Sequence, residues 1–327
     1  TENDRGLVMR LKLVPKNTSW NFFSRSKLWI GISIVLVILS LLSFFIQSLN
    51  FGIDFRGGTS IRTESSEPIV VADYRRALSS LDLGDITISE VFDPNFSDDQ
   101  NVAMIRIQAQ PGQEAATSTL VENSLQKLRE VSEDIKFVSV ESVGPKVSGE
   151  LIKTAIIAVI LAISAVLFYI WIRFEWQFAV GAISALIHDV ILTIGIFSAL
   201  QIKFDLAIIA AILTIVGYSL NDTVVVFDRV RENLRKFKKR SLVEVMNLSI
   251  NETMSRTVMT SVTTLLALIS LFILGGDVIR GFVFAMIWGV VVGTYSSIFI
   301  ASAILLWTGV KRDWSKPNAE AGTQVPQ

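Results

Sequence analysis

The chain of 327 residues contains no cysteine and only one histidine, His188. The absence of cysteine excludes disulfide bonds, thiolate metal sites and a cysteine nucleophile. A single histidine leaves no His-rich metal site, so we expect no bound metal. Lysine plus arginine and aspartate plus glutamate each number 30, but the formal net charge of zero hides a strong segregation of charge along the chain.

Apolar residues, by contrast, are abundant: they make up 51% of the chain, and the mean hydropathy is +0.52. This composition is typical of an integral membrane protein and excludes an ordinary soluble domain. A spanning helix needs about 20 predominantly apolar residues. We interpret the first such stretch as a retained span, because it is longer than a signal-peptide core and no small-residue cleavage site follows it. Six stretches qualify: 28–49, 151–172, 178–200, 206–227, 258–274 and 282–307.

Basic residues gather in three segments that six spans would place on one side of the membrane. The segments are the basic and aromatic N-terminal stretch 1–27, the connector 228–257 and the tail 308–327. The positive-inside rule predicts that this side, with both termini, is cytoplasmic. The basic residues are Arg5, Arg10, Lys12, Lys16, Arg25 and Lys27; Arg229, Arg231, Arg235, Lys236, Lys238, Lys239 and Arg240; and Lys311, Arg312 and Lys316.

One large insert, residues 50–149, is predicted on the opposite, outer side, and acidic residues outnumber basic ones in it. Its pattern predicts the order βαββαβ, which is that of a ferredoxin-like α+β domain. The fold class is thus a six-helix membrane protein with this domain inserted between helices 1 and 2. The expected strands are Gly58–Thr63, Ile86–Phe92, Val102–Gln108 and Lys136–Ser142, and the expected helices are Pro68–Leu81 and Glu114–Val131.

The insert carries no catalytic constellation. It has no histidine and no G-x-S-x-G motif, and its carboxylates are scattered. The sequence GIDFRGG at 52–58 lacks the lysine and helix of a phosphate-binding loop, so we interpret its glycines as permitting a turn into the first strand. We therefore predict a binding or lever module and not an enzyme.

Asp222 is the only charged residue in the apolar run 206–227, and Asn221 stands beside it. It lies about 9 Å along a helix from the charged cluster that opens at Asp228. A helix-capping or interfacial acid is one interpretation, but this depth is too great for a short side chain to reach the interface comfortably. Intramembrane acids usually face the bundle interior and serve transport, so we favour a functional role.

Three further polar residues accompany Asp222. His188 and Asp189 are adjacent in the span 178–200 and either titrate or form a structural polar core. Arg256, where the connector meets the span 258–274, is expected at a depth similar to that of Asp222 on an adjacent antiparallel helix. Such a pair would be either a static salt bridge or a site that switches between paired and protonated states.

Small residues recur every fourth position in the last span, at Gly289, Gly293, Ser297 and Ala301. This face permits close helix approach. The pattern does not decide whether the approaching helix belongs to the bundle or to a partner.

Five motifs are distributed along the chain: FGIDFRGGTSI, VGPKVSGEL, ALIHDV, GYSLNDTVVVFDRVREN and NETMSRTVMTS. Together they resemble the SecF branch of the SecD/SecF family, and more distantly the RND transporter superfamily. The resemblance implies an RND-like half-bundle that pairs with SecD in the bacterial inner membrane. It assigns Asp222 and Arg256 to a proton relay. His188, Asp189 and Asn221 are candidates on the evidence of the residues alone, either for that relay or for a polar core of the bundle. Protons would be the coupling ion, with no other cofactor.

The same resemblance implies a function in protein export. With SecD, the chain would use the proton motive force to drive preproteins through the SecYEG channel. YajC and YidC are further expected partners, ATP would be used by SecA, and the substrate would be unfolded preprotein; no nucleic-acid partner is expected. One alternative is an RND-type exporter of small molecules or lipids, although a single outer insert counts against a self-sufficient pump. Another is a structural assembly factor that tolerates neutral residues at Asp222 and Arg256.

Overall fold

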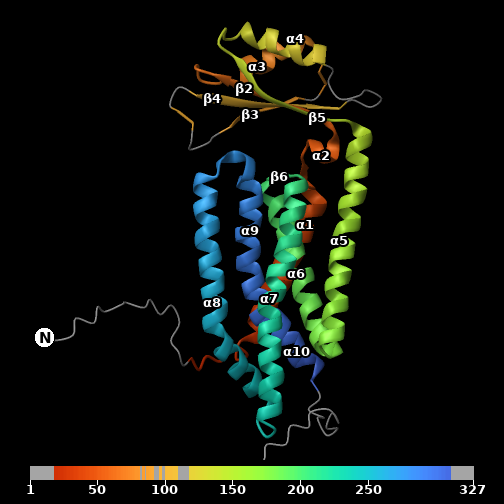
Figure 1. Ribbon diagram of the computed structural model, residues 1–327, viewed down its shortest axis with the longest axis vertical. Coiled ribbons are helices and arrows are strands. Elements are labelled where there is room, and N and C mark those ends of the chain that lie inside the picture. Colours follow the sequence, from red (N-terminus) through yellow and green to blue (C-terminus); the bar gives the residue numbers. More distant parts are fainter. Residues whose placement is uncertain are drawn as a thin grey trace, which may run out of the picture.

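The computed structural model describes residues 18–81, 83–84, 86–91, 96–97, 100–109 and 118–310. The basic residues predicted to be cytoplasmic at 5–16 and 311–316, and the predicted helix start at Glu114, lie outside these ranges. The described chain forms a helical bundle with an α+β domain at one end of it (Figure 1). The bundle consists of the apolar helices, and the domain contains the strands whose apolar and polar residues alternate.

Six helices are long and apolar enough to cross a membrane, which confirms the predicted fold class. The first has almost no buried residues and the third, fourth and sixth are the most buried, so α6, α7 and α9 form the centre of the bundle. The helices are α1 (Ser26–Gln47), α5 (Pro145–Arg173), α6 (Trp176–Leu200), α7 (Leu206–Lys236), α8 (Leu242–Leu274), and α9 (Gly276–Ser296) continued by a π-helical turn, η2 (Ser297–Ala301), and α10 (Ser302–Thr308).

The connector predicted between the fourth and fifth spans is largely helical. Helix α7 runs on to Lys236, and α8 already begins at Leu242. A capping box starts α8, because the Ser241 side chain accepts from the Glu244 N–H while the Glu244 carboxylate accepts from the Ser241 N–H. The charged residues of this connector are good helix formers, so charge ends the apolar run here without ending the helix.

The α+β domain contains a four-stranded antiparallel sheet in the order β3-β4-β2-β5, as the predicted βαββαβ pattern requires. Helices α3 and α4 cover the face of the sheet that points away from the bundle (Figure 1). Ile61, Ile105 and Leu128 are fully buried between the two layers. The elements are β2 (Gly58–Ser65), α3 (Val71–Leu78) with a 3-10 turn η1 (Ser79–Leu81), β3 (Ile86–Val91), β4 (Asn101–Gln108), α4 (Ser118–Arg129) and β5 (Lys136–Val143).

The junction between α1 and the sheet holds two elements that the sequence did not predict. The short strand β1 (Asn50–Phe51) pairs in parallel with β6 (Lys203–Phe204), and a short helix α2 (Ile53–Arg56) follows β1. Gly58 adopts φ +131°, and a Cβ there would lie 2.2 Å from the Ile107 carbonyl oxygen. The glycines of GIDFRGG therefore serve a conformational need, in agreement with the turn interpretation.

The small-residue face of the last span packs within the bundle. A Cβ on Gly289 would lie 2.3 Å from the Ile215 side chain, and one on Gly293 would lie 3.1 Å from Ser219, both on α7. Ala301 similarly meets Gly181 of α6 through its carbonyl oxygen. These contacts bring α9 close enough to α6 and α7 for short polar side chains to meet between the three helices.

Candidate intramembrane polar site

Asp189 of α6 is the hub of a hydrogen-bond network between the three central helices. Its side chain is 1% exposed. Ser219 of α7 donates to Oδ2 at 2.6 Å, and Ser296 of α9 donates to the same oxygen at 2.7 Å. His188 Nδ1 lies 3.0 Å from the other oxygen, Oδ1. These contacts satisfy a carboxylate that would otherwise be costly to bury.

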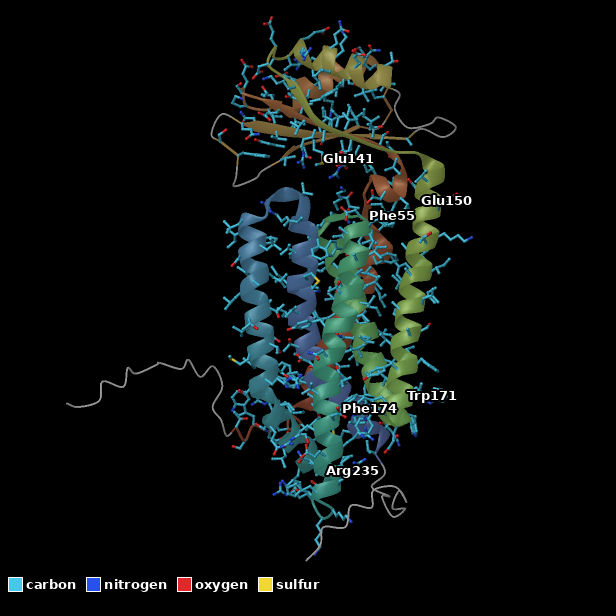
Figure 2. All side chains as sticks on the ribbon, viewed as in Figure 1. Phe55, Glu141, Glu150, Trp171, Phe174 and Arg235 are labelled. Carbon is cyan, nitrogen blue, oxygen red and sulfur yellow. The ribbon has the colours of Figure 1, made fainter. Side chains whose placement is uncertain are left out.

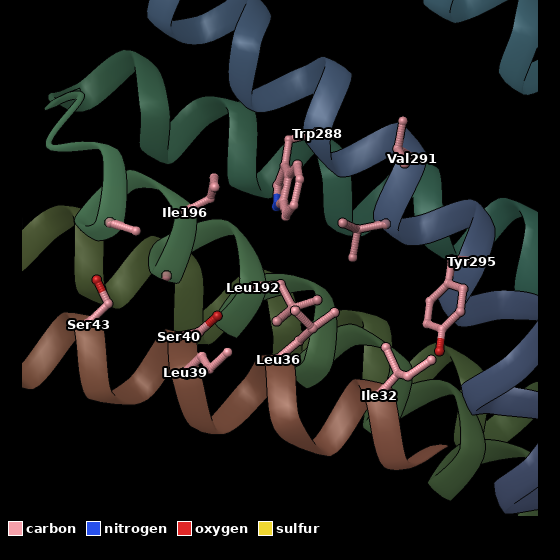
Figure 3. Close-up of a pocket in the computed structure, with 13 residues that line it drawn as sticks. Ile32, Leu36, Leu39, Ser40, Ser43, Leu192, Ile196, Trp288, Val291 and Tyr295 are labelled. Atoms are coloured by element: carbon pink, nitrogen blue, oxygen red, sulfur yellow. The ribbon is translucent and has the colours of Figure 1, made fainter. Parts of the chain in front are cut away.

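His188 thus bonds its sequence neighbour, while its ring lies against Tyr295 of α9, with centroids 6.1 Å apart. The Tyr295 hydroxyl lies 2.8 Å from Ser33 Oγ and donates to the Trp29 carbonyl on α1. Figure 3 shows Tyr295 beside an apolar cavity of about 380 Å³ between α1, α6 and α9. His188 Nε2 is buried and has no hydrogen-bond partner among the described residues.

Asp222 occupies the same interior at a position one turn further along α7 than Ser219. Its side chain is 2% exposed, and its Oδ2 atom is buried with no hydrogen-bond partner in the described part of the chain. Residues three apart share a helix face, so Asp222 points to the side on which Ser219 reaches Asp189. Two acids are therefore buried in the described part of the bundle: Asp189, whose oxygens have hydrogen-bond partners, and Asp222, whose Oδ2 atom has none.

Arg256 lies on α8, which packs against α7, and its side chain is exposed in the isolated chain. Its positive charge attracts the Asp222 carboxylate electrostatically. Within the described residues, no ion pair at 4.0 Å or less joins Arg256 to Asp222. The helices bring the two groups into electrostatic range without a direct contact.

Asn221, the remaining candidate, is exposed on α7 and points away from the interior that holds Asp222. Thr214 and Gly217 are also exposed, and all three fall on one side of α7 at helical spacing. Helix α7 thus has an exposed side that carries polar groups within its span, and Arg256 is exposed on the adjacent helix α8.

Further polar groups are buried on α7, α8 and α9. The Tyr218 hydroxyl and the Thr257 Oγ1 atom are buried and have no hydrogen-bond partner among the described residues. Ser261 Oγ of α8 lies 2.7 Å from Thr294 Oγ1 of α9. The π-helical turn η2 follows Ser296, and such turns frequently occur at functional sites.

Two site residues escaped sequence reasoning. Ser219 and Ser296 are common, short polar residues, and nothing in their immediate context marks them as partners of Asp189. The only sequence signal for these two serines was their distance along the chain from residues already singled out. Ser219 lies three residues before Asp222, and Ser296 lies three after Gly293, the glycine that admits Ser219.

The arrangement is suited to holding a proton. A buried carboxylate oxygen without a donor is costly, and either a proton or a new hydrogen-bond donor relieves that cost. In the described residues, no group of three or more histidine, cysteine, aspartate or glutamate side chains is placed to hold a metal ion. The site therefore offers titratable oxygen atoms and hydroxyl groups between helices.

Fold and site together define a polytopic membrane protein with a polar core between its central helices and a ferredoxin-like domain outside the bundle. Residues 123–311 match the family model for the C-terminal part of the protein export membrane proteins SecD and SecF, and residues 42–69 match the SecD/SecF GG motif. The chain belongs to the SecF branch of the SecD/SecF family.

The relatives support this assignment over the full length. The chain is 57% identical to the protein translocase subunit SecF of Cereibacter sphaeroides, covering 97% of this chain and 98% of that one. It is 56% identical to SecF of Rhodobacter capsulatus, covering 95% of each chain.

The solved structures agree. The crystal structure of SecDF from Thermus thermophilus, a translocon-associated membrane protein, superimposes with a TM-score of 0.78 at 34% identity and covers 90% of this chain. A second SecDF crystal structure, in a super-membrane-facing form, gives a TM-score of 0.66 at 35% identity. This chain spans about 40% of the Thermus chain and 39% of the second.

Proposed function

We propose that the chain is an accessory subunit of the bacterial Sec preprotein translocase and that, together with SecD, it uses the proton motive force to promote protein export. The relatives named as protein translocase subunits, and the solved SecDF structures, support the assignment to export. Asp222 carries the proposal for proton coupling: it is 2% exposed inside a span, and one of its oxygens has no hydrogen-bond donor among the described residues.

In the proposed cycle, Asp222 alternates between a protonated state and a charged state held by Arg256. The charged state draws Arg256 toward the α7 carboxylate, and protonation releases it, so that proton passage changes the packing of α8 against α7. Asp189 keeps its hydrogen bonds to Ser219 and Ser296 and so holds α6, α7 and α9 together during this change. His188 relays no proton in this scheme but fixes the orientation of Asp189. Protons are the coupling ion, and no other cofactor takes part.

The proposed location is the bacterial inner membrane, with the α+β domain in the periplasm. Support comes from the basic residues at the opposite end of the bundle, which include Arg173, Arg229, Arg231 and Arg235. Under the positive-inside rule this end is cytoplasmic. The periplasmic domain would then contact preprotein as it emerges and move with the bundle, in a binding and lever role that requires no catalysis.

SecD is the proposed direct partner, and the face formed by α7 and α8 is the proposed contact. Asn221 and Arg256 are exposed on that face, and polar groups within spans are costly unless they face protein or water. A second half-bundle covering this face would bury both residues and would enclose the surroundings of Asp222. The SecYEG channel, YajC and YidC are proposed as further partners, with ATP hydrolysis left to SecA.

The decisive experiment replaces Asp222 by asparagine, which has a similar shape and cannot ionise. In inverted membrane vesicles with SecD present, Asp222→Asn should abolish proton-dependent stimulation of preprotein translocation while leaving membrane insertion and SecD association unchanged. Asp73→Asn, the same change at an exposed acid outside the bundle, is the matched control and should retain full stimulation.

The outcomes separate the competing functions. Full proton-dependent stimulation by Asp222→Asn would overturn the proposed mechanism and favour a structural assembly factor. Proton-driven loss of a small molecule or lipid from vesicles that contain only this chain would instead favour an exporter of the RND type.

A further inference from the structure

A cationic cleft lies at the end of the bundle opposite the α+β domain. It has a volume of about 540 Å³ and is formed where α5 ends and α7 extends beyond the apolar run. Figure 2 places Phe174 and Arg235 at this end of the molecule, with Trp171 nearby on α5. The cleft is lined by Arg173, Asp228, Arg231, Glu232, Arg235 and Lys236.

Positive charge exceeds negative charge in the cleft. Asp228 pairs with Arg173 at 3.2 Å and lies 3.9 Å from Arg231. Glu232 pairs with Arg229, a residue outside the cleft lining. The charges of Arg173 and Arg235 both repel that of Arg231. Asp228 and Glu175 attract Arg231, but the basic residues that line the cleft still outnumber the acidic ones. An additional anion would therefore relieve the repulsion.

The guanidinium groups are held in place by packing. Arg173 and Arg231 lie 5.2 Å and 5.3 Å from the centroid of the Phe174 ring. Arg231 also donates through Nη1 to the Arg173 carbonyl oxygen at 3.4 Å, while its Nε atom is buried with no hydrogen-bond partner among the described residues. The donors are therefore ordered before any ligand arrives, which lowers the entropic cost of binding.

The surroundings of the cleft indicate that the ligand comes from the membrane. The last turns of α5 expose Tyr169, Trp171 and Ile172 by 57%, 65% and 69%, and Trp176 at the start of α6 is 58% exposed. Exposed tryptophan and tyrosine at the end of a span mark the depth of the lipid headgroups. An anion that enters the cleft from this side can leave its hydrocarbon chains along the exposed surface of α5.

From these contacts we propose that the cleft binds the phosphate of an anionic phospholipid headgroup. Arginine side chains offer paired N–H donors that match phosphate oxygens, and basic pockets between spanning helices on the cytoplasmic side are suited to such headgroups. The hydrocarbon chains lie against Trp171 and Ile172. A bound headgroup would tie the end of α5 to α7, the helix that carries Asp222.

The test measures lipid retention by native mass spectrometry of the full chain in detergent, after addition of phosphatidylglycerol and phosphatidylethanolamine at equal concentration. The wild type should retain phosphatidylglycerol preferentially. Each charge removed from the cleft, in Arg231→Gln and in Arg235→Gln, should weaken that binding by roughly fivefold. Arg240→Gln removes a charge that stacks on Phe237 outside the cleft and is the control, with binding unchanged.

Arg231→Gln loses a hydrogen bond to the backbone and could fail to fold. Arg235 is exposed, so Arg235→Gln should fold and still tests whether the cleft binds the lipid. Equal retention of the two lipids, or equal weakening by Arg240→Gln, would overturn the proposal. A competition experiment adds inorganic phosphate at millimolar concentration to the lipid-bound protein. The phosphate should leave lipid retention intact, and displacement of the lipid by phosphate alone would identify a free-anion site instead.

Discussion

Ser219 Oγ donates a 2.6 Å hydrogen bond to Asp189 Oδ2 and thereby joins the two central helices α7 and α6 at a buried carboxylate. Ser296 adds the same bond from α9 at 2.7 Å. Three spans that are separated in sequence therefore meet at one oxygen atom. Asp222, one turn from Ser219, remains the acid with an unsatisfied oxygen, and this asymmetry makes it the candidate for reversible protonation.

Replacing Ser219 by alanine should destabilise the bundle, because the buried Asp189 carboxylate then loses one of the two hydroxyl donors to its Oδ2 atom. The expected loss in the free energy of unfolding is about 1–3 kcal/mol. Thermal unfolding in detergent measures it. Ser184→Ala is the control, since the half-buried Ser184 donates to the Val180 carbonyl of its own helix and to no other helix among the described residues. Equal losses for the two variants would contradict a special role for the Ser219 bond.

Replacing Gly289 by alanine should also destabilise the bundle, for steric reasons. The added Cβ would lie between 2.3 and 2.7 Å from three Ile215 side-chain atoms, so α9 and α7 must separate or Ile215 must move. Overpacking of this kind costs roughly 1–3 kcal/mol.

The control for Gly289→Ala is Gly31→Ala, which meets nothing within 4 Å and replaces glycine by a better helix former. It should stabilise α1 by roughly 0.5–1 kcal/mol. Thermal unfolding of both variants in detergent should therefore give shifts of opposite sign, and shifts of the same sign would refute the packing argument.

The α+β domain should lose stability in acid through Asp134. The hydroxyls of Ser132, Ser65 and Ser66 and the Ser66 N–H hold the pKa of this carboxyl well below its ordinary value of 3.8. A lowered pKa stabilises the folded state above the unfolded-state value, and that contribution is lost as the pH falls below about 4. Hydrogen exchange of β2 in the full chain, measured between pH 6 and pH 3, should show falling protection.

Asp134→Asn should remove the acid-dependent part of this loss, leaving β2 less protected at pH 6 but less sensitive to acid. Asp73→Asn, which breaks only an exposed pair with Arg76, should retain the wild-type pH dependence. An unchanged pH profile in Asp134→Asn would show that another group controls acid stability.

Much of the fold followed from local sequence. Apolar length predicted all six spans, and alternation with turn residues predicted the four strands and two helices around Ile61 and Leu128. The helical connector was missed, because Arg229 and Glu232 end the apolar run while still favouring helix. The parallel pair β1 and β6 was missed as well, since two-residue strands carry no periodic signal.

The site was predicted only in outline. Sequence reasoning named Asp222, Asp189, His188, Arg256 and Asn221 because a polar residue within an apolar run is visible by itself. It did not distinguish the interior position of Asp222 from the exposed position of Asn221 next to it. Which side of a helix faces the bundle interior is known only once the neighbouring helices are placed. The protonation roles of these residues stay predictions.

The sequence by itself determined which segments are long and apolar enough to cross a membrane, which domain is inserted between them and which acids lie within the apolar segments, since length, hydropathy and turn chemistry are local properties. Only the tertiary structure decided which acid finds hydrogen-bond donors. Ser219 and Ser296 reach Asp189 because Gly293 lets α9 approach α7, whereas Asp222 Oδ2 has no hydrogen-bond partner among the described residues. That outcome depends on contacts between helices far apart in the chain, and these form only when the bundle packs.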